Sequence, residues 1–383
     1  MKALHPVQGH IDARRTLARA VAAGELPGAM LLYGPPGIGK QRLALWLAQL
    51  LLCSRRTDEP CGTCHACHLC LHLEHPDLHW FFPVPRPRSS GGADRLGEAL
   101  EETRATELAA RREEPLYSAT REESVGLFLA HVQVLRRLAQ ARPAMGPAKV
   151  FIVGDAEALV PQEASQEAAN ALLKLLEEPP ADTTVILTAA DPDSLLATIR
   201  SRLLPVRLRP LPSDDVAEFL STARGLDPGS ARVPAALSGG SIGRALAFLP
   251  DGPLEDLRQS ARAMLEAALA GEPAARLAAA LGQAPAGARA SAYLGTLDFL
   301  ATWLRDLAAV DTGAEEVVVN TDSLSWIRAR VRDRPGVAAG ISGALHAVEE
   351  AASLSTLNLN PQLTTAWLLK EISRELSRVV RVA

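Results

Sequence analysis

A glycine-rich segment near the N-terminus has the residue types and spacing of a phosphate-binding loop. The run Gly34-Pro-Pro-Gly37-Ile-Gly39-Lys40-Gln41 follows a short apolar stretch and precedes a helical pattern. In such a loop the backbone N–H groups converge on a phosphate at the start of the helix, and the lysine reaches the terminal phosphates. Gly34, Gly37, Gly39 and Lys40 are therefore the candidate nucleotide-binding residues.

The loop lacks the side chains that would hold a magnesium ion beside that phosphate. Its eighth position normally carries a Ser or Thr hydroxyl for Mg²⁺, and Gln41 stands there instead. Gly154 occupies the position after the strand Lys149–Val153 where a metal-binding Asp would stand. Asp155 comes next, but side chains alternate along a strand, so Asp155 could replace that ligand only by leaving the regular pleat. We therefore expect the loop to act structurally or in weak phosphate binding, without ATP hydrolysis.

All five cysteines lie in one short segment, between Cys53 and Cys70. This clustering argues against a spread disulfide framework and fits a metal site in a reducing compartment. Thiolates separated by two residues can chelate one tetrahedral ion, which predicts a structural Zn²⁺ held by Cys53, Cys61, Cys64 and Cys67. Rival ligand sets would use Cys70 or one of three histidines, His65, His68 and His72. A closed four-sulfur site has no open coordination position, so it would hold structure and not catalyse.

Alternating strands and helices must position the phosphate loop. The helix after the loop is expected at Lys40–Leu52, and another at about residues 165–178, where Pro179-Pro180 must end it. The expected strands are Met30–Tyr33, Lys149–Val153, Thr184–Thr188 and Leu204–Leu208, of which the second and third are expected to be buried. This alternation predicts an α/β fold with a parallel sheet.

The composition changes along the chain and divides it into three parts. Residues 1–209 form the α/β domain, which carries the zinc module at about 53–80 and a charged insertion at about 84–123. Mixed-sign charge runs usually face water, so the insertion is expected to be a surface excursion without a specific task. Residues 210–250 are expected to form a small helical lid, and residues 251–383 an all-helical domain.

Composition and charge exclude several classes of protein. The chain has 383 residues, of which 48% are hydrophobic and 22% charged, so it is neither disordered nor collagen-like. Its formal net charge of −4 gives no global basic excess for nucleic acid. No apolar run is long enough for a membrane helix, and the first residues lack a signal peptide's apolar core. A cytoplasmic protein is expected.

Several segments together, in this order and spacing, resemble the bacterial clamp-loader subunits of the AAA+ class. They are GELPGAMLLYGPPGIGK ending at Lys40, CGTCHAC followed by His75-Pro76-Asp77, Ala169–Pro180, Ile199–Arg202, Gly239–Leu246 and Asn358–Leu363. The resemblance implies an AAA+ P-loop domain with an inserted zinc module, a helical lid and an all-α collar. It also implies a hetero-pentamer with gamma/tau and delta subunits, which opens the sliding clamp and places it on primed DNA as part of the DNA polymerase III holoenzyme, a DNA-directed DNA polymerase.

The resemblance gives Ser201 and Arg202 a role. Clamp loaders carry a serine–arginine pair at this place, and its arginine reaches the ATP site of the next subunit, where it stabilises phosphoryl charge in trans. The family usually has cysteine after this arginine, whereas Leu203 stands here and affects packing more than charge. The alternative is that Arg202 pairs with a carboxylate at a helix end. Arg244 falls at the second-sensor position of the lid, where lid packing is its expected role.

Two glutamates end the predicted helix at residues 165–178. Glu177 and Glu178 lie in the last turn, where their charge opposes the helix dipole without any visible local gain. This placement suggests a partner surface, and a solvated helix end is the alternative.

The degenerate loop decides which clamp-loader type the sequence resembles. The hydrolysing gamma/tau subunits keep a threonine after the lysine and an acidic pair after the later strand, whereas this chain has Gln41 and Gly154. The resemblance therefore favours the delta-prime type, a structural subunit that is not catalytic by itself. The first alternative is an ATP-hydrolysing gamma/tau-type subunit, which the same two residues disfavour. The second is a stand-alone zinc-dependent nucleic-acid-binding module, which the near-neutral charge disfavours.

Overall fold

The computed structural model describes residues 3–87, 93–116, 125–159, 167–249, 252, 254–283, 290–355 and 360–378. Parts of the charged insertion and of the segment Asn358–Leu363, and the expected helix start at 165–166, lie outside the described residues. The chain forms two compact units, residues 1–219 with 240–243 and residues 220–239 with 244–383. The three-domain boundaries at 209 and 250 stay a prediction.

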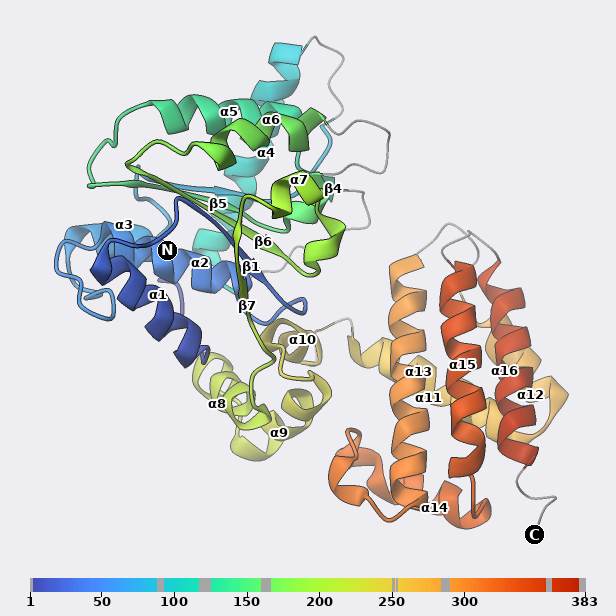
Figure 1. Cartoon of the computed structure of the whole chain (residues 1–383). Helices are drawn as coiled ribbons and strands as arrows, with labels where there is room; N and C mark the ends of the chain where they lie inside the picture. The colour runs from blue at the N-terminus through green and yellow to red at the C-terminus, as the bar shows by residue number, and fades with distance from the viewer. Residues whose placement is uncertain are drawn as a thin grey trace. The chain divides into compact units, whose positions relative to one another are not determined.

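A five-stranded parallel sheet forms the centre of the first unit (Figure 1), which confirms the predicted α/β class. Its strand order is β2-β5-β6-β1-β7, so each strand must be joined to the next along the chain by a crossover. The strands are Ala29–Tyr33 (β1), Leu78–Phe81 (β2), Lys149–Val153 (β5), Thr183–Ala189 (β6) and Leu204–Arg207 (β7). The two-residue strands Val84–Pro85 (β3) and Val125–Gly126 (β4) pair separately and antiparallel.

Helices cover both faces of this sheet (Figure 1). Along β1, Met30 and Leu32 belong to the hydrophobic cluster that includes α1 and α2, whereas Ala29 and Leu31 belong to the cluster of α5, α6 and α7. Alternate side chains of a strand point to opposite faces, which is why a strand buried on both faces is apolar throughout. The helices are Ile11–Ala23 (α1), Lys40–Leu52 (α2), His65–Leu71 (α3), Ala93–Glu113 (α4), Leu129–Gln140 (α5), Glu167–Glu177 (α6) and Ala197–Arg200 (α7), with 3₁₀ turns Ala156–Leu159 (η1) and Pro192–Ser194 (η2).

Helix α4 corrects the expectation that the charged insertion only faces water. Leu100 in this helix is completely buried. The Arg104 guanidinium lies 4.9 Å from the ring centroid of Phe81, and its Nη1 donates to the carbonyl oxygen of Trp80 at 3.3 Å. Both partners belong to β2, an edge strand of the sheet. The insertion therefore covers an edge whose backbone groups would otherwise invite pairing with another chain.

The described residues of the second unit form helices around a core that contains Trp303, which is completely buried. The indole Nε1 of Trp303 donates to the carbonyl oxygen of Arg258 at 3.3 Å. The nearly buried guanidinium of Arg258 donates to Asn320 Oδ1 at 2.8 Å and to both carboxylate oxygens of Asp322 at 2.5 and 2.7 Å. A buried cation that is fully paired fixes how its neighbours pack, because every misplacement would leave a charge unpartnered.

The helices that lie in or enter this unit are Ser213–Arg224 (α8), Pro228–Leu237 (α9), Ile242–Ala247 (α10), Leu254–Ala270 (α11), Pro273–Leu281 (α12), Ala290–Asp311 (α13), Leu324–Asp333 (α14), Ala338–Ser355 (α15) and Pro361–Arg378 (α16), with 3₁₀ turns Glu315–Val317 (η3) and Thr321–Ser323 (η4). Helix α16 begins at Pro361, and Asn360 Oδ1 accepts the N–H of Gln362 at 2.9 Å. Among the described residues, no helix has both the length and the apolar character needed to cross a membrane.

Candidate phosphate loop, cysteine cluster and exposed arginine

The predicted phosphate loop connects β1 to α2 and brings its glycines and lysine together. Gly34 must be glycine, because a Cβ there would lie 2.4 Å from the carbonyl oxygen of Leu208. Gly39, the residue before α2, has φ 96°, a left-handed value that side chains rarely allow. Lys40 Nζ donates to the loop's own carbonyl oxygens, at 2.8 Å to Gly34 and 3.0 Å to Pro35, and burial lowers the pKa of this amine. In this structure the lysine therefore binds the loop itself.

The segment that follows α9 packs on the same loop. Ser241 Oγ donates to the carbonyl oxygen of Pro36 at 3.0 Å, and the N–H of Gly243 donates to that of Gly37 at 3.0 Å. A Cβ on Gly243 would lie only 3.0 Å from the Gly37 Cα. Residues 240–243 belong to the same compact unit as the loop, so this contact forms part of one body. The sequence alone did not predict that this glycine-rich turn contacts the phosphate loop. Its run of small residues was the signal that could have indicated a close contact between two backbones.

Gln41 fills the place where a metal ligand would stand. Its Nε2 donates to Asp155 Oδ2 at 2.9 Å, and its Oε1 accepts the indole N–H of Trp80 at 3.1 Å. A Cβ on Gly154 would lie 2.6 Å from that Oε1, so the glycine leaves the room that the amide occupies. The two departures seen separately in the sequence are therefore one packing arrangement. Trp80 was missed as a member of the site, because its strand was not predicted.

Asp155 has left the regular pleat of β5, as it would need to do to approach the loop. Its φ is 49°, in the left-handed region, and its N–H donates to Thr188 Oγ1 at 3.0 Å. The carboxylate reaches the loop but binds the Gln41 amide there. An amide donor satisfies this carboxylate where Mg²⁺ would do so in a hydrolysing site.

Replacing Gly154 tests the coupling between Gln41 and its surroundings. A Gly154→Ala methyl group would displace the Gln41 amide from both of its partners, so we expect a loss of about 1–3 kcal/mol in the free energy of unfolding. In a Gln41→Ala background the same methyl group meets no amide, and its cost should shrink. Chemical denaturation of the wild type, both single variants and the double variant measures this coupling. Additive costs would contradict it.

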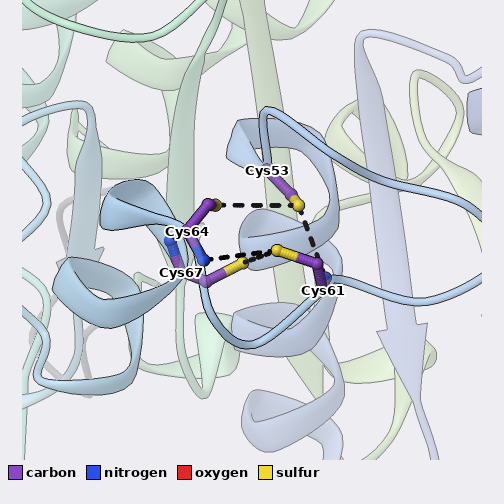
Figure 2. A group of neighbouring side chains, drawn as sticks. All are labelled: Cys53, Cys61, Cys64 and Cys67. Carbon is purple, nitrogen blue, oxygen red and sulfur yellow. Dashed lines mark hydrogen bonds between the residues drawn. The ribbon is translucent and has the colours of Figure 1, made fainter.

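Four cysteine sulfurs converge between the end of α2 and the start of α3 (Figure 2). Cys53 directly follows α2, Cys64 caps the N-terminus of α3, and Cys67 lies in the first turn of that helix. The Sγ atoms of Cys61 and Cys67 are 3.9 Å apart, as are those of Cys53 and Cys64, and all four lie within 4.8 Å of one another. Bonds of about 2.3 Å in a tetrahedron place sulfurs about 3.8 Å apart, so the group can hold a metal ion.

Backbone donors favour thiolates in this cluster. The N–H groups of Arg55 and Cys61 each lie 3.4 Å from Cys53 Sγ, and the N–H of Cys64 lies 3.3 Å from Cys61 Sγ. Hydrogen bonds from Thr63, its backbone N–H first among them, lower the pKa of Cys61 to about 5. Burial instead raises the pKa of Cys67, whose sulfur a bound cation would deprotonate.

Cys70 and the histidines do not join this group. Within the part of the chain that the structure describes, the converging set contains four cysteines and neither Cys70 nor a histidine. Cys70 packs in the core cluster of α1 and α2, and burial raises its pKa to about 12, as for an apolar thiol. His65 and His68 are exposed on α3, and His72 is the residue after that helix.

Arg202 lies at the surface, two residues after the end of the short helix α7. Ile199 and Leu203 are buried in the core, so the backbone on both sides of Arg202 is anchored. The side chain of Arg202 is 31% exposed, and its Nε donates to Glu177 Oε1 at 2.6 Å. Ser201, beside it, donates to Thr198 O at 3.2 Å. Within this chain, Arg202 thus forms the pair with a helix-end carboxylate that was the alternative reading.

Arg244 belongs to the second unit. Its guanidinium lies 5.9 Å from the ring centroid of Phe299, which is itself buried in the core of that unit. A cation over an aromatic face is a packing contact, here with α13, and the lid-packing role stays a prediction.

Comparisons with known proteins give the chain a family. A family model described as DNA polymerase III, delta subunit, matches residues 9–212. The DNA polymerase III subunit delta' of Escherichia coli (strain K12) is 30% identical over 305 residues, 79% of this chain and 75% of that protein. That of Pseudomonas aeruginosa is 35% identical over 216 residues, 56% of this chain and 53% of its own length. A tau subunit of Salmonella typhimurium is 29% identical over 215 residues, 56% of this chain and 26% of its own. The chain therefore belongs to this DNA polymerase III family, among its delta-prime clamp-loader subunits.

Proposed function

We propose that this chain acts as a non-hydrolysing subunit of a clamp loader and supplies Arg202 in trans to the ATP site of a neighbouring subunit. The observation that carries the proposal is the loop itself, which keeps its glycines and Lys40 but holds the Gln41 amide at the metal position. A loop of this kind keeps the architecture of the hydrolysing subunits and loses their chemistry.

The proposed absence of ATP hydrolysis follows from the Mg²⁺ ligands that hydrolysis of a nucleoside triphosphate requires. Mg²⁺ bridges the β- and γ-phosphates, and a loop hydroxyl and a strand-end carboxylate hold it. Here Gln41 replaces the hydroxyl, Gly154 replaces the first carboxylate, and Asp155 already has an amide partner. Weak phosphate binding by the loop remains part of the proposal, because Lys40 could exchange its two carbonyl partners for phosphate oxygens.

The trans role is supported by where Arg202 stands and how it is held. Arginine fingers need a side chain that can reach out of its own subunit from a backbone that does not move. Arg202 is partly exposed, and buried Ile199 and Leu203 fix the backbone around it. Ser201 precedes it and is the other member of the proposed pair.

The metal in this proposal is Zn²⁺ on Cys53, Cys61, Cys64 and Cys67. Four sulfurs at these separations suit tetrahedral zinc, which leaves no open position for a substrate. Bound there, the ion would cross-link the end of α2 to the start of α3 and so secure the helix that follows the phosphate loop. Its proposed role is structural.

The proposed partners are gamma/tau and delta subunits in a hetero-pentamer, with the sliding clamp and primed DNA reached through the complex in the cytoplasm. Relatives named as tau subunits match this chain in addition to those named delta', and this supports a common architecture. A near-neutral net charge of −4 fits a chain that meets DNA mainly through an assembly.

A mixing experiment tests the proposed function. The purified chain is combined with a hydrolysing clamp-loader subunit, and complex formation is followed by gel filtration and phosphate release by a coupled assay. We expect a stable complex with stimulated ATP turnover, and no turnover by the chain alone because its loop holds no Mg²⁺. Steady phosphate release by the chain alone would instead support the gamma/tau-type alternative.

A further inference from the structure

The guanidinium of Arg202 has an acceptor within the chain on each of its nitrogens. Nε and Nη2 both donate to Glu177 Oε1, and Nη1 donates to the carbonyl oxygen of Thr198 at 2.6 Å. Nη1 also lies 3.4 Å from Ser201 Oγ. An arginine that stabilises a phosphoryl group needs donors aimed at the phosphate oxygens. At least one of these internal contacts must therefore be exchanged when Arg202 acts.

Glu177 stands where its charge is unfavourable unless a cation accompanies it. It is the last residue of α6, so its carboxylate adds to the negative end of the helix dipole. Leu175 and Leu176 are buried and hold this end of the helix in place, while the Glu177 side chain is 45% exposed. Arg202 is the cation that offsets both the carboxylate and the dipole.

We propose that Glu177 is a positioning residue for Arg202: it holds the guanidinium in a resting place at the end of α6, from which Arg202 moves to the neighbour's nucleotide. This inference rests on the proposed function, because it needs Arg202 to act in trans. The nucleotide phosphates replace the Glu177 carboxylate as the partner of the guanidinium. Withdrawal leaves Glu177 unpaired at the negative end of its helix, so Glu177 opposes the active position of Arg202.

Solvent limits how strongly Glu177 holds Arg202 back from the neighbour's nucleotide. Both side chains are partly exposed, and ion pairs of that kind contribute little because water screens them. An exchange for a polyanionic phosphate group is therefore accessible, and removing the Glu177 charge should favour it about two- to fivefold. The effect should also fall with ionic strength, because it is a charge–charge term between exposed groups.

The structure offers a matched control close to Arg202 in the chain. Arg200, two residues before Arg202, forms an ion pair with Asp193, and both side chains are more exposed than their counterparts. Removing the Asp193 charge therefore deletes a similar pair without touching Arg202. Only the Glu177 pair should change the reaction of a neighbour.

The test measures ATP turnover of a hydrolysing clamp-loader subunit saturated with this chain, at low and high salt. We expect Glu177→Gln to raise the stimulated turnover about two- to fivefold at low salt and less at high salt, and Asp193→Asn to leave it unchanged. Glu177→Gln combined with Arg202→Ala should behave as Arg202→Ala alone. A purely structural role for Glu177 would lower turnover together with the free energy of unfolding, and would not depend on Arg202.

The outcomes separate this inference from the function on which it rests. If Arg202→Ala leaves turnover unchanged, the trans role is wrong and the inference is overturned with it. If Arg202→Ala lowers turnover but Glu177→Gln fails to raise it, or Asp193→Asn raises it equally, only the inference about Glu177 is overturned.

Discussion

An Arg202→Ala variant is expected to remove most of the ATP turnover that this chain stimulates in its neighbour. An arginine finger contributes about 10³- to 10⁵-fold to turnover at the site that it enters, because its charge and forked donors stabilise the transferred phosphoryl group. Alanine supplies neither, so that site should slow by about 10³-fold or more. Sites served by other subunits should keep their rate. Single-turnover hydrolysis, in a complex whose other ATP sites are inactivated, isolates the affected step.

Two further variants make this result specific to Arg202. Arg200→Ala removes the arginine that ends α7 and pairs with Asp193, and it should leave turnover unchanged. Arg202→Lys keeps the charge but loses the planar fork, so it should restore only part of the rate. Equal losses for Arg200→Ala and Arg202→Ala would point to damage of the helix and contradict the assignment.

Folding should be almost unaffected by these changes at the surface. The Arg202–Glu177 pair is partly exposed on both sides, and such pairs contribute at most about 1 kcal/mol. Ile199 and Leu203, which anchor the same segment, keep their burial in the core. A chain that binds its neighbour with normal affinity but fails to stimulate it is therefore the expected phenotype.

The central strands could be predicted because they are buried on both faces. In β5 the residues Val150–Val153 are apolar at consecutive positions, and this run is visible in the sequence alone. Strand β2, Leu78–Phe81, was missed because it contains a histidine and only one aliphatic residue, so its pattern did not stand out. Its place at the sheet edge is set by pairing with β5, a contact between segments far apart in the chain.

The long helix α4 was misjudged for a related reason. Its charges suggested a solvated surface, but the guanidinium groups of Arg104 and Arg111 lie over the rings of Phe81 and Phe82. Arginine is both a charge and a flat apolar surface, and a count of charges cannot tell which property is used. Only the position of β2 decides this, and β2 was itself not predicted.

Some features of the candidate sites could be predicted from the sequence and others could not. The loop, its missing metal ligands and the clustered cysteines are local features, so residue types and spacing revealed them. The contact of Gln41 with Asp155 spans 114 positions, and the pair of Arg202 with Glu177 spans 25, so neither could be read from spacing. Glu177 did leave one local signal, since an acid at a helix C-terminus needs a compensating cation.

Replacing a predicted zinc ligand should have the largest effect on stability. A Cys67→Ser variant is expected to lose the metal, because Cys67 is completely buried and its sulfur lies 3.9 Å from that of Cys61. Structural zinc contributes about 10–16 kcal/mol of apparent binding energy in small domains. Here the metal supports one module of a larger fold, so we expect a loss of several kcal/mol in the free energy of unfolding. Metal analysis should fall from about one Zn²⁺ per chain to none.

Cys70→Ala is the matched control for this ligand assignment. Cys70 is also buried and lies three residues after Cys67, but it packs among apolar side chains, so alanine should cost only the lost contacts and leave the metal in place. Cobalt substitution provides an independent readout, because tetrahedral thiolate coordination gives intense visible absorption. A Cys70→Ala chain without metal, or a Cys67→Ser chain that keeps the full four-sulfur spectrum, would show that Cys70 is a ligand and that the proposed ligand set is wrong. Among the described residues it is the geometry that selects the four sulfurs, because Cys53, Cys61, Cys64 and Cys67 converge within 4.8 Å of one another and Cys70 does not join them.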